Sequence, residues 1–490
     1  MTKTFDDYLK ENGEIGHIQS IVQSIVYVSG LPSLRPRELV VAEGGQRGIV
    51  QSLNGETAEI LMLETANLTN GLSVARTNET FQIPVSDAIL GRIVNPFGLP
   101  IDGAGPIEGE RKLLPLFSEA PTFVQRAKVN RPLETGVAMV DLLVPIGYGQ
   151  RELVIGDKKT GKSTFLLQTM TSEAKKGVIC IYVSIGKRLS DAKQVETYLK
   201  KTGVMQNCVL LVASSADPAT LIYLSAFSGM AIAEHFRDLG KDVIIIFDDL
   251  SNHAKFYREI SLLSKRAPGR GSYPGNIFHL HASLLERAGQ IQTADGKIVS
   301  ITALPVAETL EGDITGYIQT NLMAITDGHI FFDIEEFRKG KRPAINPSLS
   351  VSRVGNQTKN ALERTLASQI RETLAKYQRD LEIARFGVEL PESTKAVIEQ
   401  GEKIELIFHQ DVETIMPRDL QLFSLGLLLN GYWTGKPAAI VKVDLIRLVQ
   451  KYQKGDLQFM AKQINKATKL EDLVSIAKIY SGKIVEEMHV

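Results

Sequence analysis

The sequence predicts a multidomain protein with an N-terminal β-barrel, a central α/β domain and a C-terminal all-helical domain. Short strands broken by glycine turns occupy the first 85 residues, continuous apolar runs alternate with helical segments in the middle, and large apolar residues recur at helical spacing near the end. A chain of 490 residues also exceeds the size of one ordinary core. We place the domains at 1–88, 89–357 and 358–490.

Strand and turn signals predict the barrel. The segment 18–28 is rich in Ile and Val, as expected of a strand region. Asn54 and Gly55 form the dipeptide best suited to a tight hairpin, because both central residues of such a turn need positive φ. Two apolar segments, 48–53 and 57–63, flank this dipeptide. Strands and turns at this spacing are typical of a small β-barrel.

The central domain is predicted from apolar runs that show no alternation. The runs 178–183, 209–213 and 243–247 are almost entirely apolar. Runs of this kind suit parallel strands that are covered on both faces. A helix between the first strands is expected to end at residues 175–177, because Lys-Lys-Gly supplies cations and a glycine where a helix C-terminus favours them.

The C-terminal domain is predicted to be helical from residue 358 onward. Apolar residues recur there at steps of three and four, which is the spacing of one helix face, at Leu362, Leu366, Ile370, Leu374, Tyr377 and Leu381.

The composition of the sequence argues against nucleic acid and against a membrane as direct binding partners. Lys plus Arg and Asp plus Glu both number 56, so there is no basic excess and a nucleic-acid partner is not expected. No apolar stretch approaches the roughly 18 residues of a membrane span, so membrane contact is expected only through partner subunits. Cys180 and Cys208 each adjoin an apolar run and are expected to be buried free thiols.

Residues 156–163 have the spacing of a phosphate-binding loop, G-x-x-x-x-G-K-S. Its glycines let backbone N–H groups turn toward phosphate oxygens, and the positive end of the following helix faces them. Lys162 is expected to reach the terminal phosphates, and the Ser163 hydroxyl to hold Mg²⁺. The sequence therefore predicts a site for ATP or ADP with Mg²⁺, built from Gly156, Asp157, Lys158, Lys159, Thr160, Gly161, Lys162, Ser163 and Thr164.

A second metal-organising group is expected at the end of a buried strand. Asp248 and Asp249 follow the run 243–247. Asp248 is predicted to bind Mg²⁺ through water, as the corresponding acid does in other proteins with this loop. The alternative is that the two acids cap the next helix.

The residues around these motifs resemble the alpha subunits of F-type ATP synthases across nearly the whole sequence. Matching stretches lie at 90–94, 100–103, 135–136, 140–141, 144–147, 248–251, 273–275, 284–287 and 342–346. The most specific is Leu-Ser-Val-Ser-Arg-Val-Gly at 349–355, which is similar to the alpha segment that approaches the neighbouring subunit's nucleotide.

This resemblance implies the architecture and partners of that family. The central domain is then a RecA-like P-loop domain, and alpha subunits alternate with catalytic beta subunits in an alpha3-beta3 ring around a gamma-type stalk. The complex couples proton (or sodium) movement to ATP synthesis or hydrolysis. It lies as a peripheral complex on the cytoplasmic face of a membrane, here expected to be a bacterial plasma membrane.

The resemblance also assigns roles in catalysis. In catalytic relatives a glutamate that orients the attacking water follows the strand after the loop, and Lys187 occupies that position here. An ammonium cannot accept a proton, so this site is expected not to hydrolyse nucleotide. Lys187 then either pairs with the γ-phosphate or points into solvent. Arg353 is expected to act in trans, as an arginine finger in the beta subunit's site, with Ser350 in the same interface segment.

The sequence departs from the family at several positions. Only fourteen residues precede Ile15, so the resemblance does not settle the contact with a delta-type subunit of the peripheral stalk. Asn430 and Tyr432 replace the usual glutamines of the base pocket, where Tyr432 or Trp433 could stack on a base or belong to the core. Two alternatives therefore stay open: an alpha-like subunit of a specialised rotary ATPase, and a homohexameric export or translocation ATPase.

Overall fold

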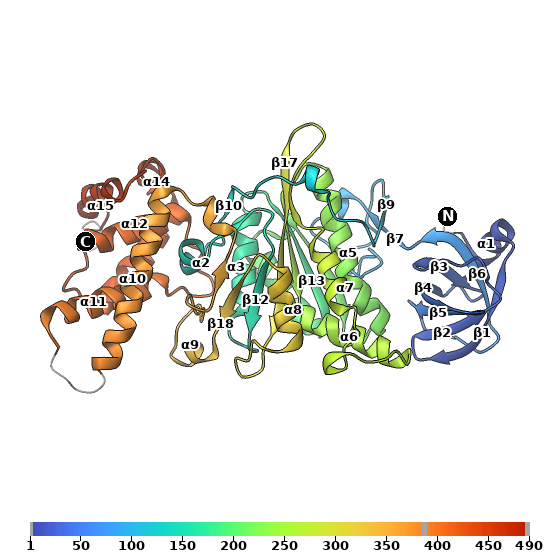
Figure 1. Cartoon of the computed structure of the whole chain (residues 1–490). Helices are drawn as coiled ribbons and strands as arrows, with labels where there is room; N and C mark the ends of the chain where they lie inside the picture. Colours follow the sequence, from blue (N-terminus) through green and yellow to red (C-terminus); the bar gives the residue numbers. More distant parts are fainter. Residues whose placement is uncertain (1–2, 385–389, 486–490) are drawn as a thin grey trace. The chain divides into compact units, whose positions relative to one another are not determined.

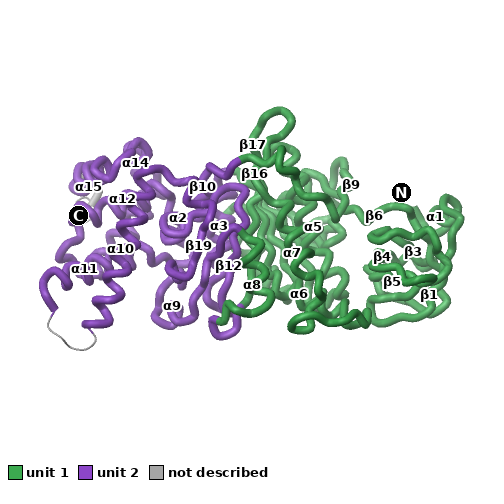
Figure 2. Tube along the Cα trace, in the orientation of Figure 1, with its two compact units in different colours: residues 1–127, 177–308, 313–326 green, residues 128–176, 309–312, 327–490 purple. Residues whose placement is uncertain are grey.

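The computed structural model describes residues 3–384 and 390–485, and the protein divides into two compact units (Figures 1 and 2). Each unit is assembled from segments that are far apart in the sequence. Unit 1, green in Figure 2, combines residues 1–127, 177–308 and 313–326. Unit 2, purple in Figure 2, combines residues 128–176, 309–312 and 327–490.

Unit 1 begins with the predicted barrel. Helix α1 (Phe5–Asn12) packs on its outside, where Phe5 and Tyr8 contact Val41 and Ala75. Alternate apolar side chains point into the barrel and form its core, as expected of strands with one buried face. Six strands close it in the order β1-β2-β5-β4-β3-β6: β1 (Ile15–Val22), β2 (Ile25–Ser29), β3 (Glu38–Ala42), β4 (Arg47–Asn54), β5 (Thr57–Met62) and β6 (Ser73–Thr80).

Two hairpins differ from the sequence prediction. The segment 18–28 is not one strand, because the backbone turns between β1 and β2 and Gln23 has φ 54°. At the other hairpin Asn54 pairs with Thr57, so the central turn residues are Gly55 and Glu56. Only Gly55 has positive φ, at 61°. The predicted hairpin exists, but its turn is shifted by one residue.

The rest of unit 1 is an α/β layer in which β8, β13, β14, β15 and β17 pair in parallel and β16 pairs antiparallel with β17. The three apolar runs form β13, β14 and β15, which confirms the predicted parallel strands. Cys180 and Cys208 are buried free thiols, as expected. The strands are β8 (Ile93–Val94), β13 (Ile179–Lys187), β14 (Cys208–Ser214), β15 (Val243–Asp248), β16 (Gly289–Gln292) and β17 (Ile298–Glu308).

Helices α5 and α6 pack against strands of this layer, with α5 in contact with β13, β14 and β15. A separate antiparallel pair, β7 with β9, precedes the layer in the sequence. The bounds are β7 (Gln82–Val85), β9 (Lys112–Pro115), α4 (Leu189–Lys201), α5 (Ala219–Asp238), α6 (Leu250–Leu263), α7 (Ile277–Leu285) and α8 (Tyr317–Ile325).

Unit 2 contains the phosphate loop and the helical domain. Strand β12 pairs in parallel with β18, and β19 pairs antiparallel with β18. The strands are β10 (Pro132–Leu133), β11 (Ile146–Gly147), β12 (Glu152–Gly156), β18 (Gly328–Phe332) and β19 (Val351–Ser352); the first helices are α2 (Ala138–Leu143), α3 (Lys162–Ala174) and α9 (Ile334–Arg338). Helix α3 ends just before Gly177, which has φ 86°.

The remainder of unit 2 is all-helical, as predicted. The described side chains at the predicted apolar positions from Leu362 to Tyr377 are buried on one face of α10. No helix in the described ranges combines the length and the hydropathy that crossing a bilayer requires. The helices are α10 (Ala361–Ala384), α11 (Glu392–Phe408), α12 (Arg418–Leu429), α13 (Ala438–Lys454), α14 (Gln458–Ile464) and α15 (Leu470–Val485).

A pair of histidines lies in the core of unit 1. His253 and His281 are 0% and 1% exposed. The Nε2–H of His253 donates to the carbonyl oxygen of Tyr223 at 2.9 Å, because a carbonyl only accepts. The neutral Nδ1 of His253 then accepts from Nε2 of His281 at 3.1 Å. This arrangement requires the His253 ring to be uncharged, and burial lowers the pKa of His281 well below its usual value.

We expect this pair to make the protein less stable below neutral pH. Burial lowers the pKa of His253 from 6.5 to about 4. The unfolded state therefore takes up a proton in this interval that the folded state excludes, so stability is complete above pH 6.5 and falls as pH falls toward 4. The expected loss from His253 alone is about 2 kcal/mol between pH 7 and pH 5, and His281, whose pKa burial also lowers, adds to it. Urea unfolding at both pH values should show it, and His253→Gln should reduce the difference.

Candidate functional site

The phosphate loop follows β12 and leads into α3, the context that the sequence predicted. Gly156 ends the strand with φ 154°, and a Cβ there would lie 2.3 Å from the carbonyl oxygen of Phe332. Gly161 has φ 105° and caps α3. The backbone thus requires glycine at both positions. Ser163 is exposed and Thr164 is partly buried in the first turn of α3.

Lys162 holds its ammonium group over the carbonyl groups of the loop. Its Nζ donates to the oxygens of Gly156 at 2.8 Å and Asp157 at 2.6 Å, and the residue is only 8% exposed. The hydroxyl of Thr160 donates to the same Asp157 oxygen at 2.7 Å. The exposed Lys158 and Lys159 add two more positive charges. The start of α3 therefore combines cations with the positive end of a helix, the combination that binds phosphate.

The side chain of Asp157 fastens the loop to a segment about 150 residues away. Its Oδ1 accepts from the backbone N–H of Gly312 at 3.0 Å and from the hydroxyl of Thr309. The N–H of Thr309 in turn donates to the oxygen of Gly156 at 3.1 Å. Sequence reasoning missed these partners, because no motif links positions so far apart.

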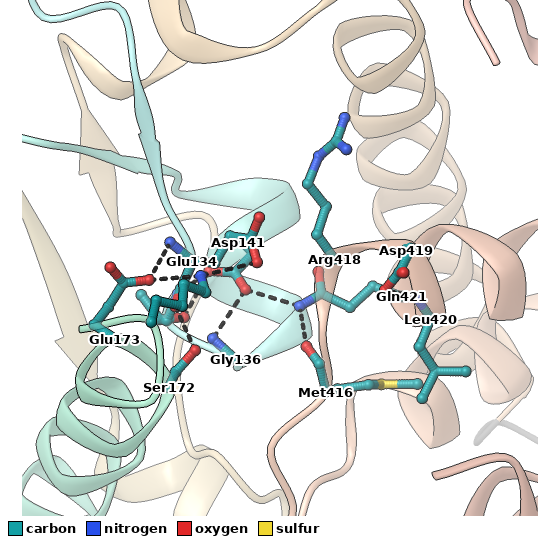
Figure 3. A network of polar contacts seen from close by, with 12 residues as sticks. Glu134, Gly136, Asp141, Ser172, Glu173, Met416, Arg418, Asp419, Leu420 and Gln421 are labelled. Atoms are coloured by element: carbon teal, nitrogen blue, oxygen red, sulfur yellow. Dashed lines mark hydrogen bonds and ion pairs between the residues drawn. The ribbon is translucent and has the colours of Figure 1, made fainter. Parts of the chain in front are cut away.

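The far end of α3 is held by a network of buried polar groups (Figure 3). The hydroxyl of Ser172 donates to the oxygen of Glu134 at 2.8 Å. Two residues after Glu134, the N–H of Gly136 donates to the carboxylate of Asp141 at 3.1 Å. The same carboxylate accepts from Nε2 of Gln421 in α12 at 2.7 Å. The helix behind the loop is thus tied through residues 134–141 to the C-terminal helices.

The two predicted acids lie in unit 1 and have different roles. Asp249 caps α6, since its Oδ1 accepts from the N–H of Asn252 at 2.6 Å. Asp248 is 2% exposed, and its two oxygens accept from the hydroxyl of Tyr182 and from the ammonium of Lys187. Lys187 therefore does not extend into solvent as one of its predicted orientations required, but forms an ion pair with Asp248.

Arg353 is exposed at the end of the short strand β19. Its N–H donates to the oxygen of Asp327 at 3.0 Å, and within the described ranges its guanidinium makes no ion pair. The preceding residue, Ser352, fixes the backbone: its hydroxyl donates to the oxygen of Pro145 at 2.6 Å and accepts from Nε2 of Gln150 at 3.2 Å. An exposed arginine on a fixed backbone is suited to binding an anion.

A buried carboxyl group lies within range of the charge of this arginine. Glu152 is 0% exposed, and one of its oxygens accepts from Nε2 of Gln150 at 2.6 Å. Burial raises the pKa of Glu152 well above its usual range, whereas Gln150 and the charge of Arg353 act in the opposite direction. Gln150 thus connects the buried carboxyl with Ser352 and so with the strand that presents Arg353.

Ser350 is engaged within its own subunit. Its hydroxyl donates to the oxygen of Asn346 at 2.7 Å and accepts from the N–H of Phe331 at 3.0 Å. The hydroxyl therefore holds the segment before Arg353 against β18. Its predicted contribution in trans stays a prediction.

The predicted base-binding residues lie at the C-terminal end of α12. Asn430 and Tyr432 are both partly buried, and the Lys436 ammonium lies 3.6 Å from the centre of the Tyr432 ring. Trp433 is fully buried and donates from Nε1 to Asp444 at 3.0 Å, so it belongs to the core. In the described part of the protein, no hydrogen bond or ring contact joins Asn430 or Tyr432 to the phosphate loop. Their base-binding role stays a prediction.

Two family models and several known proteins that are similar to this chain all belong to the same family. Residues 136–352 match the nucleotide-binding domain of the ATP synthase alpha/beta family, and residues 357–479 match that family's C-terminal domain. The ATP synthase subunit alpha of Caldanaerobacter subterraneus subsp. tengcongensis is 42% identical over 91% of this protein and 88% of its own length. That of Mycoplasmopsis synoviae is 40% identical over 87% and 80%. That of Dictyoglomus turgidum is 38% identical over 90% and 87%. The chain belongs to the ATP synthase alpha/beta family, in the branch of the alpha subunits.

Proposed function

We propose that this protein is a nucleotide-holding, non-hydrolytic alpha subunit of an F-type ATP synthase, and that it contributes Arg353 to the catalytic site of a neighbouring beta subunit. The observation that carries the proposal is the combination of a complete phosphate loop with Lys187 at the position of the catalytic carboxylate. A loop that binds phosphate but lacks a group to orient or deprotonate water retains nucleotide without cleaving it.

Arg353 supports the second half of the proposal. A guanidinium that is exposed, carried on a fixed backbone and without an ion pair among the described residues can reach a phosphate on another subunit at little cost in conformational entropy. Ser350, Ser352 and Gln150 are positioning residues in this scheme, because their hydrogen bonds hold the strand and the loop beside Arg353.

The two predicted protein ligands of Mg²⁺, Ser163 and Asp248, are not equally suited to holding the metal. The exposed hydroxyl of Ser163 in the first turn of α3 suits a metal that also binds phosphate, and such an ion would neutralise part of the phosphate charge. Asp248 fits less well, because both of its oxygens already accept hydrogen bonds from Tyr182 and Lys187. We therefore propose Ser163 as the protein ligand, with the loop and the lysines 158, 159 and 162 supplying the remaining contacts to ATP or ADP.

The partners follow from the proposed role. Beta-type subunits would alternate with this one in an alpha3-beta3 ring, a gamma-type stalk would occupy its centre, and the coupled ion would be a proton or sodium. The complex would be peripheral, on the cytoplasmic face of a bacterial plasma membrane, with membrane contact through other subunits. The departures at Asn430 and Lys187 also suit an alpha-like subunit of a specialised rotary ATPase.

Purification of the tagged protein from its source, with mass spectrometry of its partners, tests this proposal. A beta-like subunit bearing the missing glutamate together with a gamma-like coiled coil is the expected result. A self-assembled hexamer of this protein that hydrolyses ATP would overturn it and favour an export or translocation ATPase. The identity of the remaining partners separates a principal synthase from a specialised complex.

A further inference from the structure

Unit 1 contains a cavity of about 230 Å³ between the barrel and the α/β layer. Its walls come from the turn before β3 and from β4 and β5 on one side, and from α5, α6 and α7 on the other. The hydroxyl of Ser264, just after α6, donates across the two walls to Glu59 of β5 at 2.7 Å. The hydroxyl of Thr220 in α5 donates to that of Ser24 at 3.3 Å. Barrel and layer belong to one compact unit, green in Figure 2, so the cavity is a feature of unit 1 alone.

The charged side chains that line this cavity are cationic. They are Arg37 and Arg266, and none of the lining residues, every one of which the structure describes, is Asp or Glu. Arg266 donates to Oε1 of Glu59 at 3.0 Å, so its charge is compensated. Arg37 is exposed and has no acidic partner in the described ranges; its guanidinium instead lies 4.9 Å from the centre of the Phe117 ring. The cavity thus carries one positive charge without a counter-ion.

The Arg37 side chain is held in place from both ends. Its backbone N–H donates to the oxygen of Val50 in β4 at 2.7 Å, and its φ of 68° lies in the left-handed region that few residues other than glycine adopt. At the other end, the Phe117 ring beneath the guanidinium packs on Phe227 of α5, with 4.9 Å between ring centres. The guanidinium is therefore positioned before a ligand arrives, which lowers the entropic cost of binding one.

Tyr223 of α5 adds a second donor that is not in use. The residue is 6% exposed and lines the cavity, and within the described part of the protein its hydroxyl makes no hydrogen bond, although a buried phenol normally finds a partner. By contrast, the hydroxyl of Tyr257, whose ring stacks on that of Tyr223, donates to Asn276 at 3.1 Å. Burial raises the pKa of the Tyr223 phenol, whereas the charges of Arg37 and Arg266 act in the opposite direction. Both guanidinium groups thus lie near a hydroxyl that stays protonated at neutral pH and can donate.

We propose that this cavity is a binding site for a small phosphate-bearing molecule, held by Arg37 and by the hydroxyl of Tyr223. The N–H groups of a guanidinium match two oxygens of a phosphate, and the phenol supplies a further hydrogen bond. The volume of about 230 Å³ is below the roughly 300 Å³ at which pockets for drug-sized ligands begin, so a phosphate, a pyrophosphate or a short phosphate ester fits better than a whole nucleotide. The described lining includes no residue of the phosphate loop, so this site is separate from that of the proposed function and does not depend on it.

Isothermal titration calorimetry of the full-length protein tests the proposal with three probes: inorganic phosphate, pyrophosphate and glycerol phosphate. The protein carries Lys162→Ala, which weakens phosphate binding at the loop. We expect saturable binding of at least one probe, and the tightest one shows whether the ligand is an inorganic phosphate or an ester. Adding Arg37→Gln should weaken that binding about 100-fold, because it removes a charge and a paired set of donors. Adding Tyr223→Phe should weaken it about tenfold, because it removes one donor to a charged group.

Arg35→Gln is the matched control, because it removes an exposed arginine two positions before Arg37 that does not line the cavity. It changes the net charge equally, so its affinity should stay within about twofold of the parent protein's. Tyr223→Phe keeps the packed ring, so it gives a result even if Arg37→Gln does not fold. Failure of all three probes to bind, an equal loss for Arg35→Gln and Arg37→Gln, or unchanged binding in Tyr223→Phe would overturn the inference. ATP binding by the wild type is measured separately, so these outcomes leave the proposed function intact.

Discussion

Replacing Arg353 with alanine is expected to lower multi-site ATP hydrolysis by the assembled complex by roughly 10³- to 10⁵-fold, the contribution of an arginine finger to phosphoryl transfer. The side chain is exposed and unpaired within the described residues, so its removal breaks no ion pair there. Its backbone stays fixed by the bond from its N–H to Asp327 and by the contacts of Ser352. The loss should therefore arise in the partner's site.

Three measurements distinguish this effect from a general defect. The variant complex should assemble normally, and the isolated Arg353→Ala subunit should bind ATP as tightly as the wild type, because the phosphate loop is untouched. Arg338→Ala is a matched control, since that arginine is 67% exposed and pairs across one helical turn with Glu335. Its ATPase rate should be near that of the wild type. Near-normal steady-state ATPase activity in the Arg353→Ala complex would exclude a role in trans.

Much of the fold could be predicted because its signals are local. The runs that became β13, β14 and β15 lack alternation, and only a strand covered on both faces tolerates that pattern. The loop at 156–163 carries its own spacing, and its flanking strand and helix are continuous with it in sequence. The register of a hairpin is harder to predict from the sequence. The Asn54-Gly55 dipeptide favours a turn, but cross-strand packing in the barrel decides which residues lie at the centre of that turn.

The contacts that define the site could not be predicted in the same way. The Asp157 carboxylate accepts hydrogen bonds from Thr309 and Gly312, and the Asp248 carboxylate accepts them from Tyr182 and Lys187. The residues of these pairs are 61 to 155 positions apart in the sequence. A single sequence holds no signal for such pairings. Only the structure shows that β13 and β15 are parallel neighbours, with Ser184, three residues before Lys187, opposite Asp248.

Loss of the Lys162 side chain should cause the strongest fall in ATP affinity at the phosphate loop. Lys162→Ala removes a buried ammonium that is available to the phosphates, and a hydrogen bond to a charged group contributes about 1.5–3 kcal/mol, which is roughly a 10- to 150-fold loss of ATP affinity. The substitution also removes one donor from each of the oxygens of Gly156 and Asp157, which keep their bonds from Thr309 and Thr160. We therefore expect the affinity to fall toward the upper end of this range, as measured by equilibrium dialysis of the purified protein.

The position of the charge, and not the total charge, should determine this loss. Lys175→Ala removes an exposed lysine just beyond the other end of α3 and changes the net charge equally, so it should bind ATP within about twofold of the wild type. Gly156→Ala tests the backbone: its Cβ would lie 2.3 Å from the Phe332 oxygen, so the loop must move and ATP retention should also be lost. If Lys162→Ala and Lys175→Ala bind ATP equally well, nucleotide binding does not occur at this loop, because a site built on the start of α3 cannot be indifferent to which end of the helix loses its cation.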